Sequence, residues 1–212
     1  MTTEIPKVTE IVADVYDITV KQAPDARWRV FLFDGPTPTL VDAGFADTVD
    51  VVAAAAEELG ITPERIIITH GDGDHVGGLG GLVDRFDLES WVPEAVEVEV
   101  EPDYRFGDGD EIGPFIAVSI AGHARGHHSL VDEDRGIAVI GDALFGSDTR
   151  GLPPGYFVLP TAHYSDDLGR ADDELSNFLA YDFDVGLLYH GTNVTENASE
   201  KVAAFVDFGG KR

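Results

Sequence analysis

Short apolar runs rich in Val, Ile and Phe recur along the chain and are separated by turn residues, a pattern typical of β-strands. The pattern predicts strands over residues 10–19, 28–33, 39–41, 65–69, 89–92, 115–120, 128–132, 136–140 and 185–189, and an edge strand over 95–100. Between the second and third of these strands, Asp34, Gly35 and Pro36 predict a hairpin turn.

Four segments have the spacing of helices, namely 47–59, 76–86, 165–179 and 195–208. Asp47 and Ser165 are the expected N-caps of two of them, and Gly60 ends the first. Residues 146–160, rich in Gly and Pro, predict an irregular loop. Because strands dominate and helices are few, we expect an α+β fold in which two sheets pack face to face with helices outside.

The composition restricts the size of the core and the kind of site. At 212 residues, 43% of them hydrophobic, the chain is expected to form one domain over 1–212. The first residues lack the pattern of a signal peptide and no apolar run reaches membrane-spanning length, so a cytoplasmic protein is expected. With no cysteine, any metal must be held by nitrogen and oxygen atoms.

Acidic residues strongly outnumber basic ones, with 40 Asp plus Glu against 14 Lys plus Arg and a net charge of −26. This charge repels phosphates and anionic lipids, which disfavours nucleic acid and membranes as partners. Acid spread along the whole chain is typical of adaptation to the high-salt cytoplasm of a halophilic archaeon, where salt screens the repulsion. A cationic partner is the alternative. The expected partner is a small-molecule substrate. The sequence leaves open whether the protein forms a homodimer.

The densest group of potential metal ligands follows the apolar run Ile66–Ile68. His70, Asp72, Asp74 and His75 lie within six residues, among glycines that permit tight turns. Because alternate residues of an extended chain point to the same side, the first two of these can face one ion together. The stretch therefore predicts a metal-binding loop at the carboxyl end of a strand.

Three further potential ligands each follow a predicted strand and lie close to glycine. They are His123, Asp142 and His190. This recurrence predicts a single site built at one edge of the sheets.

The order of these residues resembles that of the metallo-β-lactamase-fold hydrolase superfamily, which includes hydroxyacylglutathione hydrolases and acyl-homoserine lactonases. The family pattern is His-x-His-x-Asp-His, then a His within Gly-His-x-x-Gly-His, a bridging Asp and a final His. In this chain the pattern falls on His70, Asp72, Asp74, His75, His123, Asp142 and His190. The resemblance covers nearly the whole chain and implies a four-layer αββα sandwich with a dinuclear site.

The resemblance also implies the role of each ligand. It implies two divalent ions, most often zinc in this family. One ion would be bound by His70, Asp72 and His123, the other by Asp74, His75 and His190, with Asp142 between them. A metal-bound hydroxide would attack an acyl carbon while one ion polarises the carbonyl oxygen. Asp74 is the expected catalytic residue, because it can also orient the hydroxide.

Asp72 departs from the family pattern, in which most relatives have histidine. A carboxylate is a harder ligand than imidazole and shifts the preference of the site toward iron or manganese. The similar flavodiiron proteins, which hold iron, have an acidic residue at this position. The alternative is that Asp72 is a solvated acid beside a weakened first site.

The expected reaction is hydrolysis of a small thioester or ester, with Arg125, Arg150 and Tyr164 as candidates for substrate binding. Lactonases that resemble this chain carry a tyrosine where Phe145 stands, so a lactonase is an alternative with less support. The helical extension that binds glutathione in hydroxyacylglutathione hydrolases is missing after His190, which disfavours a glutathione substrate.

Two alternatives come from other functional classes. One is a mononuclear iron dioxygenase acting on persulfides, whose relatives share the fold and use the equivalents of His70, His123 and Asp142. The other is a metal-binding protein without catalysis. The complete second ligand set favours two metals over the dioxygenase. β-Lactam hydrolysis and nucleic-acid processing are not expected, given the start of the chain and its charge.

Overall fold

The computed structural model describes residues 5–23 and 26–209, which form two compact units. The first unit comprises residues 5–92 and 96–105, and the second comprises residues 93–95 and 106–209. Each unit contains its own sheet and its own hydrophobic core. Among the described residues, no helix has the length and apolar character needed to span a membrane.

The sheet of the first unit has its strands in sequence order: β1 (Lys7–Val12), β2 (Val15–Ala23), β3 (Ala26–Phe33), β4 (Thr39–Val41), β5 (Arg65–Ile67), β6 (Glu89–Pro93) and β7 (Tyr104–Phe106). Neighbours from β1 to β4 are antiparallel, whereas β4, β5 and β6 are parallel. Parallel neighbours present their carboxyl ends at the same edge, so the segments after β4 and β5 emerge together.

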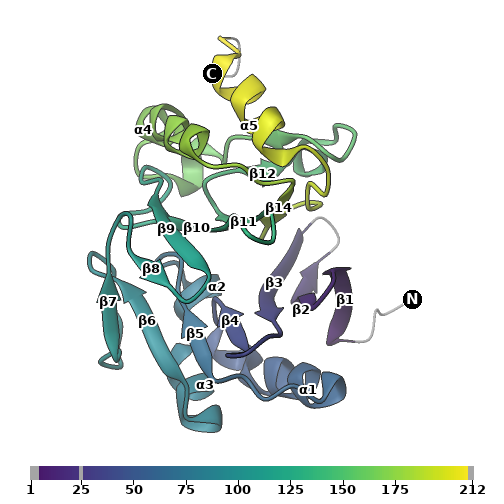
Figure 1. The fold of residues 1–212 in the computed structure, drawn as a ribbon, viewed down its shortest axis with the longest axis vertical. Coiled ribbons are helices and arrows are strands. Elements are labelled where there is room, and N and C mark those ends of the chain that lie inside the picture. Colours follow the sequence, from purple (N-terminus) through teal and green to yellow (C-terminus); the bar gives the residue numbers. More distant parts are fainter. Residues whose placement is uncertain (1–4, 24–25, 210–212) are drawn as a thin grey trace. The chain divides into compact units, whose positions relative to one another are not determined.

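Helices α1 (Val49–Leu59) and α3 (Leu79–Phe86) cover one face of this sheet (Figure 1). The 3-10 helix η1 (Ala46–Thr48) precedes α1, and the single turn α2 (Gly73–Val76) precedes α3. Apolar residues of α1 and α3, among them Val52 and Leu82, pack against Ile18 and Leu32 of the sheet. Ile68 and Leu79, which flank the segment that carries the first four predicted ligands, belong to this core.

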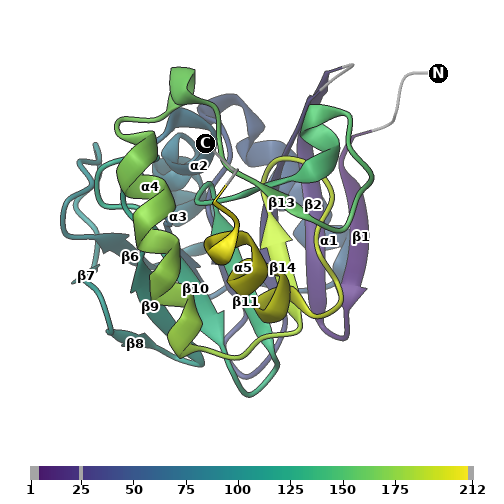
Figure 2. The ribbon, with the colours of Figure 1, turned by 90° about the horizontal axis from the view of Figure 1, so that it is seen from above.

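The sheet of the second unit has the order β14 (Val185–Leu188), β11 (Ile137–Gly141), β10 (His128–Asp132), β9 (Phe115–Ser119) and β8 (Glu111–Ile112). Helices α4 (Leu168–Glu174) and α5 (Ala198–Asp207) and the 3-10 helix η4 (Leu175–Ala180) cover one of its faces (Figure 2). Phe178 and Val202 pack there against Val118 and Ile140.

The irregular loop predicted over 146–160 contains little regular structure. Its elements are short: β12 (Phe145–Gly146), η2 (Ser147–Arg150) and β13 (Phe157–Val158), followed by η3 (Ala162–Tyr164). β12 and β13 form a separate two-stranded sheet.

Two strand predictions are wrong. Residues 10–19 contain the end of β1, a turn and the start of β2, because Asp14 takes a left-handed conformation with φ of 65° that reverses the chain. Residues 95–100 form no strand, and β7 takes the place at the edge of the sheet. The hairpin of β3 and β4 is confirmed.

All four helix predictions need correction at their N-termini, the fourth because α5 begins at Ala198 and not at residue 195. The first helix begins at Val49, and the carboxylate of Asp47 lies 3.0 Å from the Lys21 ammonium instead of capping. Residues 76–86 are interrupted after α2. In the third, Asp167 is the cap, accepting the Arg170 N–H at 3.0 Å, whereas the Ser165 hydroxyl donates to a carbonyl oxygen.

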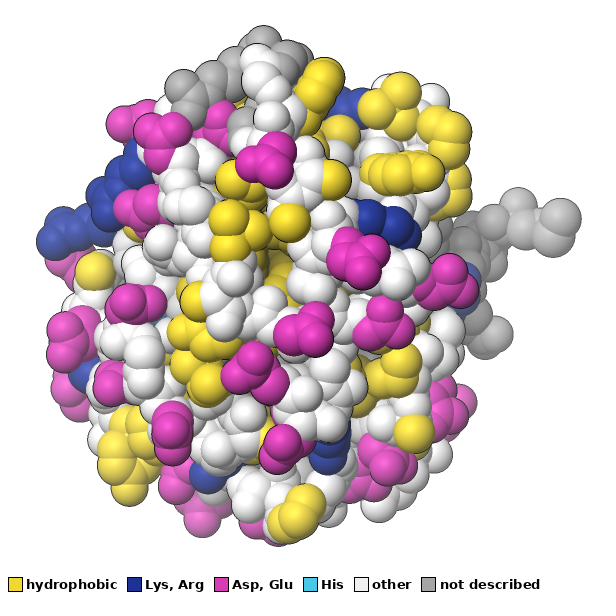
Figure 3. Space-filling view, turned by 45° about the horizontal axis from the view of Figure 1, so that its top comes forward, with side chains coloured by type: hydrophobic (Ala, Val, Ile, Leu, Met, Phe, Trp, Pro, Cys, Tyr) yellow, Lys and Arg dark blue, Asp and Glu magenta, His cyan; other side chains and the backbone are white. Residues whose placement is uncertain are grey.

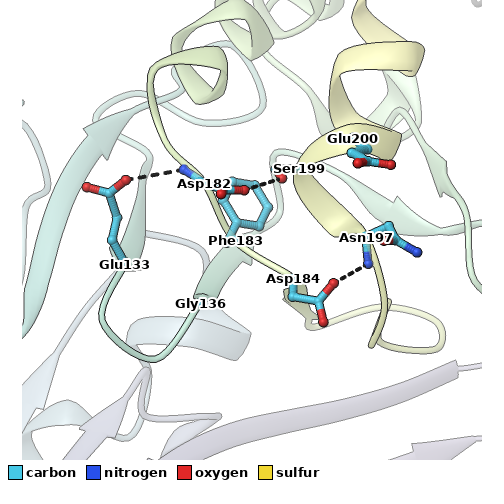
Figure 4. A pocket seen from close by; sticks show the side chains of 8 residues that line it. All are labelled: Glu133, Gly136, Asp182, Phe183, Asp184, Asn197, Ser199 and Glu200. Carbon is cyan, nitrogen blue, oxygen red and sulfur yellow. Dashed lines mark hydrogen bonds between the residues drawn. The ribbon is translucent and has the colours of Figure 1, made fainter.

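An acidic hollow in the second unit lies at the start of α5 (Figure 4). Its lining residues are Glu133, Gly136, Asp182, Phe183, Asp184, Asn197, Ser199 and Glu200. Asp184 accepts the N–H of Asn197 at 2.5 Å, and Asp182 accepts the hydroxyl of Ser199 at 3.0 Å. These carboxylates satisfy polar groups at the beginning of the helix, so the hollow has a structural explanation.

Candidate metal centre

The first four predicted ligands lie in the segment between β5 and α3 of the first unit. His70 and His75 are buried, whereas the side chain of Asp72 is 46% exposed and that of Asp74 20% exposed. Asp72 precedes α2 with extended backbone, and Asp74 and His75 lie within that turn. The rings of His70 and His75 stand 4.0 Å apart between centroids, so the loop gathers two imidazoles and two carboxylates.

The carboxylate of Asp42, at the carboxyl end of β4, orients both of these histidines. It accepts the Thr69 N–H at 2.7 Å, the Thr69 hydroxyl at 2.7 Å and Nδ1–H of His75 at 2.8 Å. Because the Thr69 hydroxyl donates its only proton to Asp42, its oxygen accepts from Nδ1 of His70 at 3.0 Å. Both rings therefore carry the proton on Nδ1 and the lone pair on Nε2, the tautomer that binds a metal through Nε2.

Asp42 is a residue whose role the sequence pattern showed only in part. Its place directly after a strand indicates no more than a structural hydrogen-bond acceptor, and the hydrogen bonds with Thr69 and His75 show what it accepts from. Its position is special in two ways: the side chain is fully buried, and φ is 63°, a conformation uncommon for a residue with a side chain. Thr69 was missed, although a hydroxyl directly before a ligand histidine is a usable signal.

Two glycines let the ligand loop pack closely on the segment after β4. A Cβ at Gly78 would lie 2.3 Å from the carbonyl oxygen of Ala43, and one at Gly77 would lie 3.0 Å from the main-chain nitrogen of Ala46. The Gly78 N–H donates to the Gly44 carbonyl at 3.0 Å, and the Ala43 N–H donates to the His75 carbonyl at 2.6 Å. The helix predicted over 76–86 is interrupted here because the Gly78 N–H is bonded to the Gly44 carbonyl and not to a carbonyl one helical turn earlier, although both glycines keep right-handed helical dihedrals.

The second unit brings the other three predicted ligands together. Asp142 and His190 follow β11 and β14, which are parallel neighbours, so both residues emerge at the same sheet edge. His123 lies in the β9–β10 connection. Oδ2 of Asp142 is 3.4 Å from Nε2 of His123 and 3.2 Å from Nε2 of His190.

The loop that carries His123 is held by α4 and the segment before it. A Cβ at Gly122 would lie 2.2 Å from the main-chain nitrogen of Ala171, and φ of Gly122 is 124°, so only glycine fits. The carbonyl oxygen of His123 accepts the Asp166 N–H at 2.9 Å, and its Nδ1 is 3.4 Å from the Ser165 hydroxyl.

These donor atoms fit a divalent metal ion. Two ligand atoms on one tetrahedral ion, each about 2.0–2.1 Å from it, stand about 3.3 Å apart. The two Nε2–Oδ2 separations at Asp142 match this value, and Nε2 of His70 and His75 lie 3.6 Å and 3.7 Å from the carboxylates of Asp72 and Asp74. Imidazole and carboxylate are ligands for zinc, iron and manganese.

The residues predicted to bind substrate lie in the second unit and are exposed. Arg125 is in the loop of His123, and Tyr164 is 68% exposed in η3. Arg150 donates to the Leu159 carbonyl at 2.9 Å, which fixes its guanidinium on the loop after β12. The ring of Phe145 stands 4.7 Å from that of His190 and 6.3 Å from that of His123, an apolar wall beside two ligands.

Residues 30–182 match the model of the metallo-β-lactamase superfamily. The chain belongs to this superfamily. Its fold is also that of solved members: it is similar to a metallo-β-lactamase from Hirschia baltica, with a TM-score of 0.72, 19% identity and coverage of 96% of this chain and 98% of that one. A metallo-β-lactamase family protein from Thermus thermophilus matches with a TM-score of 0.70, 17% identity and coverage of 93% and 79%. The predicted metallo-β-lactamase fold is thereby confirmed.

Curated relatives of this superfamily member include a hydroxyacylglutathione hydrolase from Xanthomonas euvesicatoria. It is 32% identical over 123 residues, which is 56% of this chain and 46% of the relative. The chain thus spans about half the length of the curated relatives it matches first.

Proposed function

We propose that this protein is a metal-dependent hydrolase of a small acyl substrate, a thioester or an ester. The observation that carries the proposal is the set of oriented ligands: imidazoles whose Nε2 atoms face carboxylates in each unit, in the order of the superfamily motif. The names of curated relatives, which describe hydrolysis of an acylated glutathione, support this substrate class.

The proposed centre holds two divalent ions. The ligands are assigned as follows: His70, Asp72 and His123 to one ion, Asp74, His75 and His190 to the other, and Asp142 to both. Membership of the superfamily supports this assignment for six of the seven ligands, which lie within the matched residues 30–182, whereas the assignment of His190 rests on the order of the motif. Within the second unit, Oδ2 of Asp142 lies close to Nε2 of both His123 and His190, as a shared carboxylate requires.

Such ions lower the pKa of a water molecule and polarise the carbonyl group of a substrate. Asp74 would hold the attacking water by accepting a hydrogen bond, since its carboxylate is 20% exposed and can be reached by solvent. Arg125 or Arg150 would bind a substrate carboxylate, and Tyr164 would contact the acyl group or the leaving group. Phe145 offers this region an apolar surface and no hydroxyl, which disfavours a lactonase.

The proposal is tested by metal analysis of protein purified in high salt, followed by assays of thioesters, esters, lactones, phosphodiesters and persulfides with and without oxygen. We expect about two divalent ions per chain and oxygen-independent hydrolysis of thioesters or esters. Binding of a single iron with oxygen consumption on persulfides would contradict the hydrolase and establish the dioxygenase. Metal without turnover would establish a binding protein.

Substitution of Asp72 tests its role as a ligand. As a ligand it adds a negative charge to the first ion, so Asp72→His should shift the bound metal from iron or manganese toward zinc. It should also move the alkaline rise of the pH–rate profile to lower pH, because more positive charge reaches the bound water.

Asp72→Ala should lose the first ion. The exposed Asp84, which lies within α3, serves as control in Asp84→Ala. If Asp72→Ala retains the metal content and kinetics of that control, Asp72 is a solvated acid.

A further inference from the structure

One buried histidine next to the predicted ligands of the second unit has no place in the ligand set. His127 ends the loop that carries His123 and is fully buried. Its Nε2 accepts the main-chain N–H of Asp142 at 3.0 Å. The ring therefore contacts the backbone of the residue whose carboxylate stands between His123 and His190.

This hydrogen bond determines the tautomer of His127. A main-chain N–H can only donate, so Nε2 carries the lone pair and the proton of the neutral ring is on Nδ1. Since the lone pair of Nε2 is engaged by Asp142, this nitrogen is not a metal ligand. His127 is distinguished in this way from His123, whose Nε2 faces the Asp142 carboxylate instead.

The main chain of His127 is held on both sides of the loop. Its N–H donates to the carbonyl of Ala124 at 3.2 Å, and its carbonyl accepts the N–H of Ile120 at 3.1 Å. Asp142 in turn follows Gly141, whose φ of 64° turns the chain out of β11. One side chain thus joins the base of the His123 loop to the first residue after β11.

We propose that His127 is a positioning residue that holds the backbone of Asp142, and through it directs the Asp142 carboxylate toward His123 and His190. A buried N–H that loses its acceptor must find another partner, which requires the backbone after Gly141 to rotate. The carboxylate would rotate with it. The effect on metal binding rests on the proposed function, whereas the hydrogen bond itself does not.

The hydrogen bond is tested directly by NMR on metal-free, ¹⁵N-labelled protein. A coupling across the N–H···N bond between the Asp142 amide and Nε2 of His127 is expected, with the ring proton on Nδ1. A protonated Nε2, or absence of the coupling in a well-resolved spectrum, would overturn the proposal.

The positioning role is tested with His127→Leu, which removes the acceptor, and His127→Gln, whose side-chain oxygen can replace Nε2. The matched control is His128→Leu, because Nδ1 of His128 lies 2.9 Å from the Gly126 carbonyl and its ring contacts Phe106. We expect His127→Leu to weaken metal affinity about 10–100-fold and to change the visible spectrum of bound Co²⁺. His127→Gln should recover most of the affinity, and the control should match wild type.

Equal affinity and equal Co²⁺ spectra for His127→Leu and His128→Leu would overturn the positioning role. If His127→Leu does not fold, the decision rests on His127→Gln. If His127→Gln binds the metal no more tightly than a variant that lacks a ligand, the positioning role is overturned. If the wild-type protein binds no divalent metal, the proposed function fails, and the NMR coupling by itself then decides whether His127 holds Asp142.

Discussion

Replacement of His190 by alanine is expected to remove one of two bound metal ions and to lower kcat/KM by roughly three orders of magnitude or more. The imidazole of His190 lies 3.2 Å from the Asp142 carboxylate, so its loss leaves His75 as the one proposed nitrogen ligand of the second ion. The fold should survive, because the hydrogen bond of this residue with β12 is made by its carbonyl oxygen, which accepts the Gly146 N–H at 2.9 Å, so alanine loses only the ring contact with Phe145. Metal content, circular dichroism and turnover on the best acyl substrate are the measurements.

A matched control is His163→Ala, since His163 is an exposed histidine of the same unit, in η3. This variant should keep two ions. Full metal content and full turnover in His190→Ala would show that the dinuclear assignment is wrong.

Raising KCl from dilute buffer to molar concentration is expected to raise the melting temperature by about 10 °C or more, equivalent to roughly 3 kcal/mol in the free energy of unfolding. The net charge of −26 comes from acidic side chains distributed along the whole chain, and Figure 3 shows them scattered over the face in view, with few basic side chains among them. Salt shortens the Debye length from about 10 Å at 0.1 M to about 3 Å at 1 M, which reduces the repulsion between these charges.

Sucrose is the control that separates charge screening by KCl from stabilisation by any excluded cosolvent. It stabilises compact states but does not screen charge. We expect sucrose at matched osmolality to have a much smaller effect than KCl. A melting temperature that does not change with KCl would contradict adaptation to high salt and favour a cationic partner for the acidic surface.

Elements with strong local signals were predicted well from the sequence. The apolar runs before His70, Asp142 and His190 are strands β5, β11 and β14, and Gly60 ends α1 with φ of 70°. The errors occurred where contacts distant in sequence decide the local conformation. The helix predicted over 76–86 is interrupted because the backbone at Gly77 and Gly78 packs against residues 43–45, which no periodicity within the helix indicates.

The edge of a sheet is a second case of this kind. Residues 95–100 alternate between apolar and acidic, as an edge strand would, yet they form no strand. Pairing depends on which segment reaches the neighbouring strand, and β7 occupies that position in the sheet. Alternation alone carries no information about the partner.

The sequence by itself determined the chemical character of the candidate site. With no cysteine, only imidazole and carboxylate ligands remain, and their order along the chain indicated the superfamily that was then confirmed. These properties are readable because the ligands lie in short segments that follow strands, four of them after β5 and one after each of β9, β11 and β14, so residue type and spacing carry the signal.

Only the tertiary structure decided how the ligands are oriented. The tautomer of a histidine is set by the hydrogen bond of its other ring nitrogen. For His75 that partner is Asp42, which is 33 residues away along the chain. The acceptor that holds the Asp142 backbone is His127, 15 residues before it. Such partners meet only when separate strands are brought to the same sheet edge, and for this reason the sequence pattern names the ligands but not the ring nitrogen that each presents.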